Sequence, residues 1–157
     1  MSEKVLVREV TLPEEKRKIA RLVLEDLPDW FGNEKAREDY IADSAGAPFA
    51  AAFLDGEPAG FLALKETSPT AVEVMVMGVG RAYHRKGAGR ALMDWAFDFA
   101  RSRGYKFIHL KTLDESANYP PYEVTRAFYR AVGFEALTCL PQIWDEENPC
   151  LIMVRGI

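Results

Sequence analysis

Residues 71–90 read Ala-Val-Glu-Val-Met-Val-Met-Gly-Val followed by Gly-Arg-Ala-Tyr-His-Arg-Lys-Gly-Ala-Gly-Arg. The first nine residues are mainly apolar and β-branched, which is typical of a central strand. The loop that follows carries five basic side chains if His84 is counted. From Gly87 to Arg103 the apolar residues recur with helical spacing. The sequence therefore predicts a strand, a basic glycine-containing turn and an amphipathic helix in direct succession.

Two glycines, Gly87 and Gly89, stand where this helix begins. The first NH groups of a helix lack intrahelical acceptors and carry the positive end of the helix dipole, so they bind anions. Glycine lets the backbone approach a ligand closely, while Arg85, Lys86 and Arg90 add charge-assisted contacts. The pattern indicates a phosphate site; the alternative is a plain strand-to-helix turn with a solvated basic loop.

Two other phosphate-binding motifs are excluded by spacing. A P-loop requires Lys-Ser or Lys-Thr after its last glycine, but Ala88 and Arg90 follow the two glycines. The dinucleotide-binding fingerprint requires a third glycine, and that position is Tyr83 or Leu92, depending on where the pattern starts. A different kind of phosphate ligand is therefore indicated.

Residues 77–92 resemble the acyl-CoA loop of the GNAT family of N-acetyltransferases, whose core is Gln/Arg-x-x-Gly-x-Gly/Ala. Gly87 and Gly89 match this core, and His84 occupies the Gln/Arg position. A second block, residues 125–134, is similar to the late family helix that ends in Phe-Tyr-x-x-x-Gly-Phe. Two motifs in the family's order, about 40 residues apart, are far more specific than either alone.

The resemblance implies acetyl-CoA as a co-substrate, without a metal, and assigns residues to it. The loop would hold the CoA diphosphate through its backbone NH groups, and a strand NH near its end would polarise the thioester. Asn118 is a further candidate CoA contact, because Glu123 stands where the family often has an asparagine. The other expected cofactor-binding residues are Met77, Val79, His84, Arg85, Lys86, Gly87, Ala88, Gly89 and Arg90.

Two residues are candidates for proton transfer. The resemblance implies that Tyr129 protonates the departing CoA thiolate; a tyrosine at the core margin with a solvated hydroxyl is the alternative. Glu73, the one charge in the central strand, corresponds to the general base of related histone acetyltransferases. A structural role is equally open, because the expected hairpin register places Lys65 opposite Glu73 as an ion pair.

The acceptor is expected to be a small-molecule or peptide amine. Trp30 and Phe31 lie in a loop between the first two predicted helices, which in the family forms part of the acceptor wall. One of the two is expected to fold onto the core and the other to contact the substrate. A homodimer is an expectation from the resemblance alone.

The whole chain of 157 residues is predicted to form one acyl-CoA N-acyltransferase domain, residues 1–157. The expected fold is α/β (α+β) and GNAT-like, a mixed, mostly antiparallel sheet of about seven strands flanked by about four helices. A net charge of −4 argues against a general nucleic-acid binder. Without an apolar run of roughly 20 residues or a signal-peptide core, a soluble cytoplasmic protein is expected.

Several finer expectations concern packing. Cys139 and Cys150 are read as packed, reduced thiols without metal-ligand spacing, although a disulfide between their two strands remains an alternative. His109 is assigned no role, since a lone strand histidine is usually structural. The predicted buried stripes are Ile19, Leu22, Val23 and Leu27 in the first helix, and Val124, Ala127, Phe128, Ala131 and Val132 in the last.

Other expectations concern turns and caps. Residues 48–67 read as a hairpin around the Asp-Gly turn at residues 55–56, and Asn33 is the expected N-cap of the second helix. Residues 114–122 are expected to form an irregular, extended loop before the last helix. Two antiparallel strands, residues 134–140 and 149–155, are expected to pair around a loop at residues 142–148.

The motifs together favour direct attack of an amine on acetyl-CoA in a ternary complex. Two alternatives belong to other functional classes. A non-catalytic acyl-CoA-binding or sensor domain would keep the phosphate loop without needing Tyr129, and a scaffold that has lost the cofactor would bind no ligand. The retained tyrosine favours the enzyme.

Overall fold

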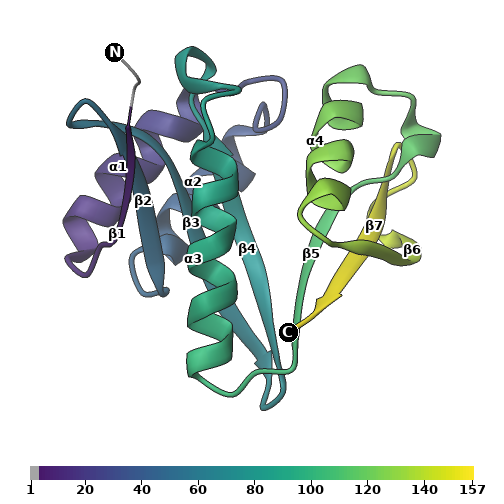
Figure 1. The fold of residues 1–157 in the computed structure, drawn as a ribbon. Coiled ribbons are helices and arrows are strands. Elements are labelled where there is room, and N and C mark those ends of the chain that lie inside the picture. The colour runs from purple at the N-terminus through teal and green to yellow at the C-terminus, as the bar shows by residue number, and fades with distance from the viewer. Residues whose placement is uncertain (1–3) are drawn as a thin grey trace. The chain divides into compact units, whose positions relative to one another are not determined.

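The computed structural model describes residues 4–157 and contains one seven-stranded mixed sheet (Figure 1). The strand order is β1-β2-β3-β4-β5-β7-β6, in which β4 and β5 run parallel. This architecture confirms the predicted fold class. The strands are β1 (Val5–Glu9), β2 (Phe49–Leu54), β3 (Glu57–Ser68), β4 (Ala71–Val79), β5 (Phe107–Leu113), β6 (Glu135–Asp145) and β7 (Asn148–Gly156). The helices are α1 (Pro13–Glu25), α2 (Glu34–Ser44), α3 (Ala88–Ser102) and α4 (Pro120–Ala131), with short 3-10 turns η1 (Arg81–Tyr83) and η2 (Glu115–Ala117).

Contacts divide the chain into two compact units. Unit 1 contains the described residues up to 65 and residues 75–99, and unit 2 contains residues 66–74 and 100–157. Strands β3 and β4 contribute to both units, because the chain changes unit within each of them. The assignment of residues 1–157 to a single domain stays a prediction.

In unit 1, α1 and α2 pack against one face of the strands. Their buried side chains form a cluster with strand residues such as Phe49, Phe61 and Val76. Leu62 and Leu64 point to the opposite face of the sheet and are also fully buried. Figure 1 shows α3 on this opposite face of the unit 1 strands. The prediction that Leu22 is buried was wrong, since its exposed fraction is 56%.

The β2–β3 hairpin forms as predicted around an Asp-Gly turn. Asp55 and Gly56 both have positive φ, at 50° and 81°. Two such residues make the type I′ turn, whose twist matches that of the flanking strands. The turn sets the pairing of Leu54 with Glu57 and of Phe53 with Pro58, beyond which the register shifts between Ala52 and Phe53.

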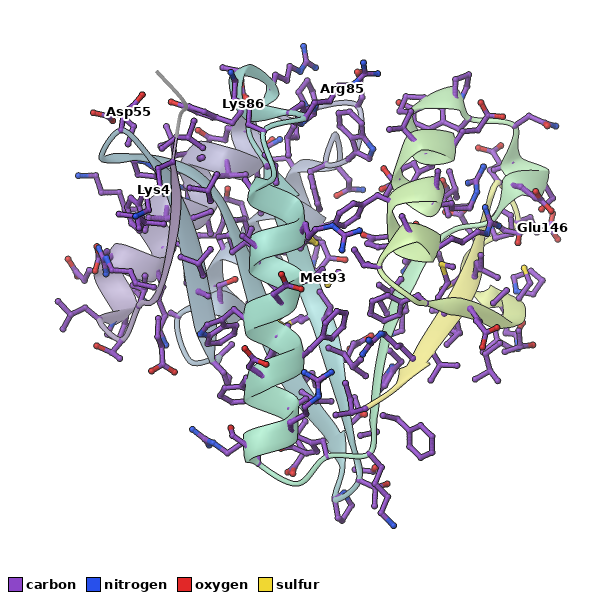
Figure 2. The ribbon with its side chains drawn as sticks, viewed as in Figure 1. Lys4, Asp55, Arg85, Lys86, Met93 and Glu146 are labelled. Carbon is purple, nitrogen blue, oxygen red and sulfur yellow. The ribbon has the colours of Figure 1, made fainter. Side chains whose placement is uncertain are left out.

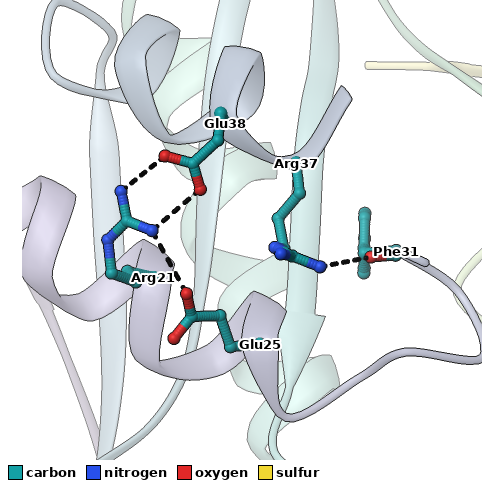
Figure 3. Close-up of polar contacts among 5 residues, drawn as sticks. All are labelled: Arg21, Glu25, Phe31, Arg37 and Glu38. Carbon is teal, nitrogen blue, oxygen red and sulfur yellow. Dashed lines mark hydrogen bonds and ion pairs between the residues drawn. The ribbon is translucent and has the colours of Figure 1, made fainter. Parts of the chain in front are cut away.

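Two arginines order the helices and the loop between them (Figure 3). Arg21 of α1 donates to both carboxylate oxygens of Glu38 in α2, at 2.7 and 2.8 Å. Its guanidinium also donates to Glu25 at 3.1 Å. Arg37 donates to the Phe31 carbonyl at 3.3 Å, so α2 fixes the backbone of the loop that carries Trp30 and Phe31. The predicted N-cap is confirmed too, with Asn33 accepting from the Ala36 NH at 2.9 Å.

Unit 2 is built on β5, β6 and β7 with helix α4. β7 pairs antiparallel with both β5 and β6. β4 pairs with β5 over three positions, the last joining Glu73 to His109. The β6–β7 hairpin is longer than predicted, because its strands continue through most of the expected loop to a turn at Asp145.

Helix α4 differs from the prediction at its start and on its buried face. Pro120 begins the helix instead of extending the loop. Proline is tolerated at this position because the NH group that it lacks would have no intrahelical acceptor in the first turn. The apolar stripe was wrong at Val124, Ala127 and Ala131, which are exposed, whereas Val132 is buried. Arg126 is buried instead, because its guanidinium donates to the Leu113 carbonyl at 2.7 Å.

The two cysteines are free thiols on opposite faces of the β6–β7 hairpin. Cys139 pairs with Leu151 and its neighbour Leu140 pairs with Cys150. Successive strand residues point to opposite faces, so the two thiols point apart. Cys150 is buried as expected, but the prediction that Cys139 is packed was wrong, since it is exposed.

We therefore expect one thiol per chain to react with an aromatic disulfide reagent in the folded protein. Burial raises the pKa of Cys150 to about 11 and withholds it from the reagent. Desolvation raises the pKa of Cys139 as well, so the titration is run at about pH 9. Cys139→Ser should abolish the reaction and Cys150→Ser should leave it unchanged. Fast reaction of both thiols, or of neither, would contradict this assignment.

Candidate active site

The predicted phosphate turn lies in unit 1, where η1 leads into α3. Gly87 has φ 86° and accepts the Ala91 NH at 3.0 Å, so it forms the N-cap of the helix. The Ala88 side chain is buried and anchors the first turn, while Gly87 is exposed. The first NH groups of α3, from residue 88 onward, thus begin at an exposed glycine, which is the arrangement that binds anions.

Basic side chains flank this turn. Arg85 takes the left-handed conformation, with φ 65°, two residues before Gly87. Figure 2 shows Arg85 and Lys86 in the turn that precedes α3, with Met93 farther along the helix. Arg85, Lys86 and Arg90 are all exposed. These side chains are therefore accessible from solvent to a phosphate group, as the expected charge-assisted contacts require.

His84 connects the turn to the end of β4. Its Nε2 lies 2.6 Å from the carbonyl oxygen of Val79, and its ring meets the Trp30 ring edge-on with centroids 6.1 Å apart. His84, the residue at the Gln/Arg position of the motif, thus links the loop to the last residue of β4. Val79 and Met77, both half-buried, lie in the part of β4 that belongs to unit 1.

The loop is also tied to the C-terminal end of α1. Asp26 accepts the Arg81 NH at 2.8 Å, and Asp29 lies 3.5 Å from the Arg81 guanidinium. The Gly80 NH donates to the Ala59 carbonyl of β3 at 2.8 Å. These contacts hold the backbone before any ligand is bound, which lowers the conformational entropy that binding must remove.

Trp30 and Phe31 both pack against the unit 1 core while staying half-buried. Phe31 also meets Tyr40 of α2 edge-on, with ring centroids 6.0 Å apart. The expectation that one aromatic folds onto the core thus applies to both, and the substrate contact stays a prediction.

The candidate base lies in unit 2 and is paired. Glu73 is 6% exposed, and its Oε2 accepts from the Lys111 ammonium at 2.8 Å. An ion pair was anticipated as one of two roles, but with Lys65 as the partner. A buried carboxylate needs a counter-charge, and β5 supplies it through Lys111.

His109 lies beside Glu73 in the β4–β5 ladder. Its Nε2 is 2.7 Å from the Thr67 hydroxyl oxygen, which itself donates to the Ala71 carbonyl at 3.3 Å. Burial lowers the pKa of His109; the Lys111 ammonium adds to this and the Glu73 carboxylate opposes it. The imidazole is therefore neutral at physiological pH, since its ordinary pKa is about 6.5.

Tyr129 lies on α4 in unit 2 and is half-buried. Its ring packs against Phe128 and Phe134, at centroid distances of 5.8 and 6.1 Å. This agrees with the expected position at the margin of the core, and its role as an acid stays a prediction. Asn118, before the helix, has φ 53° and donates weakly to the Ser116 carbonyl at 3.5 Å, so its local role is in a turn.

Unit 1 thus gathers His84 through Arg90 with Met77 and Val79, and unit 2 gathers Glu73, Tyr129 and Asn118. Sequence reasoning missed three contributing residues. Nothing in the sequence distinguishes Asp26 from any other acidic residue at a helix end. Lys111 and Thr67 make their contacts through the pairing of strands, which local sequence patterns do not reveal. The sequence offered a signal only for Lys111, which alternation places on the same face of β5 as His109.

Two other features are absent from residues 4–157. No helix there is long and apolar enough to span a membrane. In the same residues, no group of three or more His, Cys, Asp or Glu side chains is arranged to hold a metal ion.

Comparison with known proteins identifies a family. Residues 16–134 match the Acetyltransferase (GNAT) family. Among curated proteins, N-alpha-acetyltransferase RimI of Mycobacterium tuberculosis is 36% identical over 77 residues, which are 49% of this chain and 43% of that protein. An uncharacterized Mycobacterium leprae protein, ML0378, is 35% identical over 97 residues, which are 62% of this chain and 24% of that protein. The chain thus spans less than half the length of either curated relative.

Solved structures share the fold over nearly the whole chain. A protein assigned to the GNAT family from Desulfovibrio desulfuricans aligns with a TM-score of 0.80 and 20% identity, covering 98% of this chain and 99% of that one. The yncA protein of Salmonella typhimurium, solved with its cofactor acetyl-CoA, aligns with a TM-score of 0.70 and 16% identity, covering 97% and 93%. At such identities the likeness establishes the fold.

Proposed function

Because the chain belongs to the Acetyltransferase (GNAT) family, we propose that it transfers the acetyl group of acetyl-CoA to the nitrogen of a primary amine. The observation that carries this proposal is the turn at Gly87, which ends in an exposed helix N-terminus flanked by basic side chains. That turn has the chemistry to bind the CoA diphosphate. We infer an amine acceptor because one relative, RimI, is named as an N-alpha-acetyltransferase.

The transfer proceeds by direct attack within a ternary complex. The ammonium of the acceptor first loses a proton, and the free amine attacks the thioester carbonyl. A backbone NH near Met77 to Val79 stabilises the oxyanion that forms. The carbon–sulfur bond then breaks, Tyr129 donates its proton to the thiolate, and the proton lost by the new amide nitrogen restores the tyrosine. Net products are the amide, CoA thiol and one proton.

A covalent acetyl-cysteine intermediate is disfavoured. Cys150 is buried with a pKa raised to about 11, so little of the reactive thiolate is present near neutral pH. Cys139 is exposed on β6, and desolvation raises its pKa as well. Neither thiol has the lowered pKa that an acyl-accepting cysteine requires.

The experiment is an assay of CoA thiol release from acetyl-CoA across a panel of amines, peptide N-termini and lysine peptides. We expect at least one class of amine to raise thiol release well above the rate without acceptor. Acetyl-CoA at about 100 times its dissociation constant should also stabilise the fold by about 2.7 kcal/mol. Stabilisation without any amine-dependent release would favour the sensor, and neither effect would favour the scaffold.

A further inference from the structure

We propose that His109, with its ring oriented by Thr67, is the general base that takes the proton from the acceptor ammonium. This inference rests on the proposed acetyl transfer and assigns a step that the family motifs leave open. It concerns residues of unit 2 alone: Thr67, Glu73, His109 and Lys111.

The first argument is that Glu73 is already engaged. Its carboxylate is almost fully buried and lies 2.8 Å from the Lys111 ammonium. The carboxylate is thus already occupied as a hydrogen-bond acceptor and ion-pair partner, and its burial leaves it little access to a substrate. The proton of the substrate therefore needs another acceptor nearby.

The second argument concerns the tautomer of His109, which we assign from its hydrogen bonds. Thr67 donates its hydroxyl proton to the Ala71 carbonyl at 3.3 Å. In that arrangement Thr67 Oγ1 accepts at its 2.7 Å contact with His109, which assigns the ring proton to Nε2. The lone pair is consequently on Nδ1, and that atom is the base.

The third argument is position and charge. His109 ends the β4–β5 ladder opposite Glu73, so its ring lies beside the ion pair of Glu73 and Lys111. The charged groups that act on the ring are Glu73 of β4 and Lys111 of β5, and its β7 partner is the uncharged Val154. Burial keeps the imidazole neutral and so ready to accept a proton.

The step balances without a further reactant. An N–H bond of the ammonium breaks as a bond forms between that proton and Nδ1. The imidazole becomes an imidazolium, and the nitrogen lone pair is released for attack. The imidazolium returns its proton to solvent after the amide has formed.

The test is the pH dependence of kcat/KM in five variants, using an amine found in the panel. We expect the wild-type value to fall at acid pH as His109 becomes protonated, with a midpoint below the ordinary histidine pKa of about 6.5 because burial lowers the pKa of this ring. In His109→Gln that limb should disappear, and the rate should rise about tenfold per pH unit through neutrality, following the free amine. Near pH 7 this variant should lose about 10²- to 10⁴-fold in kcat/KM.

Neighbouring variants move the same limb in opposite directions. Glu73→Gln removes a charge that favours the imidazolium, so the limb should shift to lower pH. Lys111→Met removes a charge that disfavours it, so the limb should shift to higher pH. Thr67→Val should slow turnover because the ring loses its acceptor, and Thr67→Ser should restore the wild-type rate.

The opposite pattern would overturn the proposal. If Glu73→Gln abolishes the limb while His109→Gln keeps it with near wild-type turnover, Glu73 is the base. Circular dichroism of each variant shows whether a loss of activity comes from misfolding. The shift of the acid limb expected in Lys111→Met tests the role of His109 in a protein that keeps this histidine. A wild-type chain that acetylates no amine would instead contradict the proposed function itself.

Discussion

Tyr129→Phe should lower kcat by about 10²- to 10⁴-fold and leave the KM for acetyl-CoA nearly unchanged. The phenolic proton is the one group removed, and it is needed only when the carbon–sulfur bond breaks. The aromatic ring keeps its packing against Phe128 and Phe134, so the fold of α4 should not change. A loss confined to kcat is the signature of an interaction made in the transition state.

Tyr122→Phe is the matched control. It removes a second tyrosine hydroxyl from the same helix, at a half-buried position. We expect its kinetic constants to stay close to those of the wild type. If Tyr129→Phe also keeps its kcat to within about threefold, the thiolate obtains its proton elsewhere and Tyr129 is a boundary residue.

Gly87→Ala should weaken acetyl-CoA binding by about 10- to 100-fold. An added Cβ at this position would meet no protein atom within 4 Å and would project into open space at the turn where we place the diphosphate. Displacing a phosphate from one charge-assisted NH contact costs about 1.5–3 kcal/mol. Binding is measured by titration calorimetry with acetyl-CoA.

Backbone strain requires its own control, because Gly87 has φ 86° and alanine disfavours that region by about 1–2 kcal/mol. Gly104 supplies it. This residue has φ 79°, and a Cβ there would also meet no atom within 4 Å. Gly104→Ala should therefore lower the unfolding free energy by a similar amount while acetyl-CoA affinity stays unchanged. Equal affinity losses in both variants would contradict a direct role for Gly87.

Local patterns predicted the elements that carry the phosphate turn. The alternating apolar residues of β4, the Asp-Gly turn at residues 55–56 and the N-cap Asn33 each depend on neighbours in sequence. Gly87 and the helix that follows it are equally local. The succession of strand, glycine turn and helix around Gly87 was therefore readable from the chain before any tertiary contact was known.

The buried face of α4 was not readable in this way. Apolar periodicity selected Val124, Ala127 and Ala131, which are exposed. The helix instead buries Arg126, because a carbonyl at the end of β5 accepts its guanidinium. A polar anchor whose acceptor comes from another element leaves no periodic signal in the helix itself.

The pairing of Glu73 was missed for a topological reason. Lys65 was expected opposite it because a hairpin brings neighbouring strands together in a countable register. Lys111 reaches Glu73 from β5, which pairs with β4 in parallel after a crossover through α3. The register of a parallel pair is set by the packing of the intervening helix and not by a turn, so it could not be counted from the sequence.

The central claim is that backbone NH groups at the start of α3 bind the CoA diphosphate and so present the thioester for transfer. The most direct measurement compares the dissociation constants of acetyl-CoA and acetyl-pantetheine, which has the same thioester but no diphosphate. Two lost charge-assisted contacts predict an affinity at least about 100-fold weaker for acetyl-pantetheine. Equal affinities would contradict the claim, because the thioester arm alone would then account for binding.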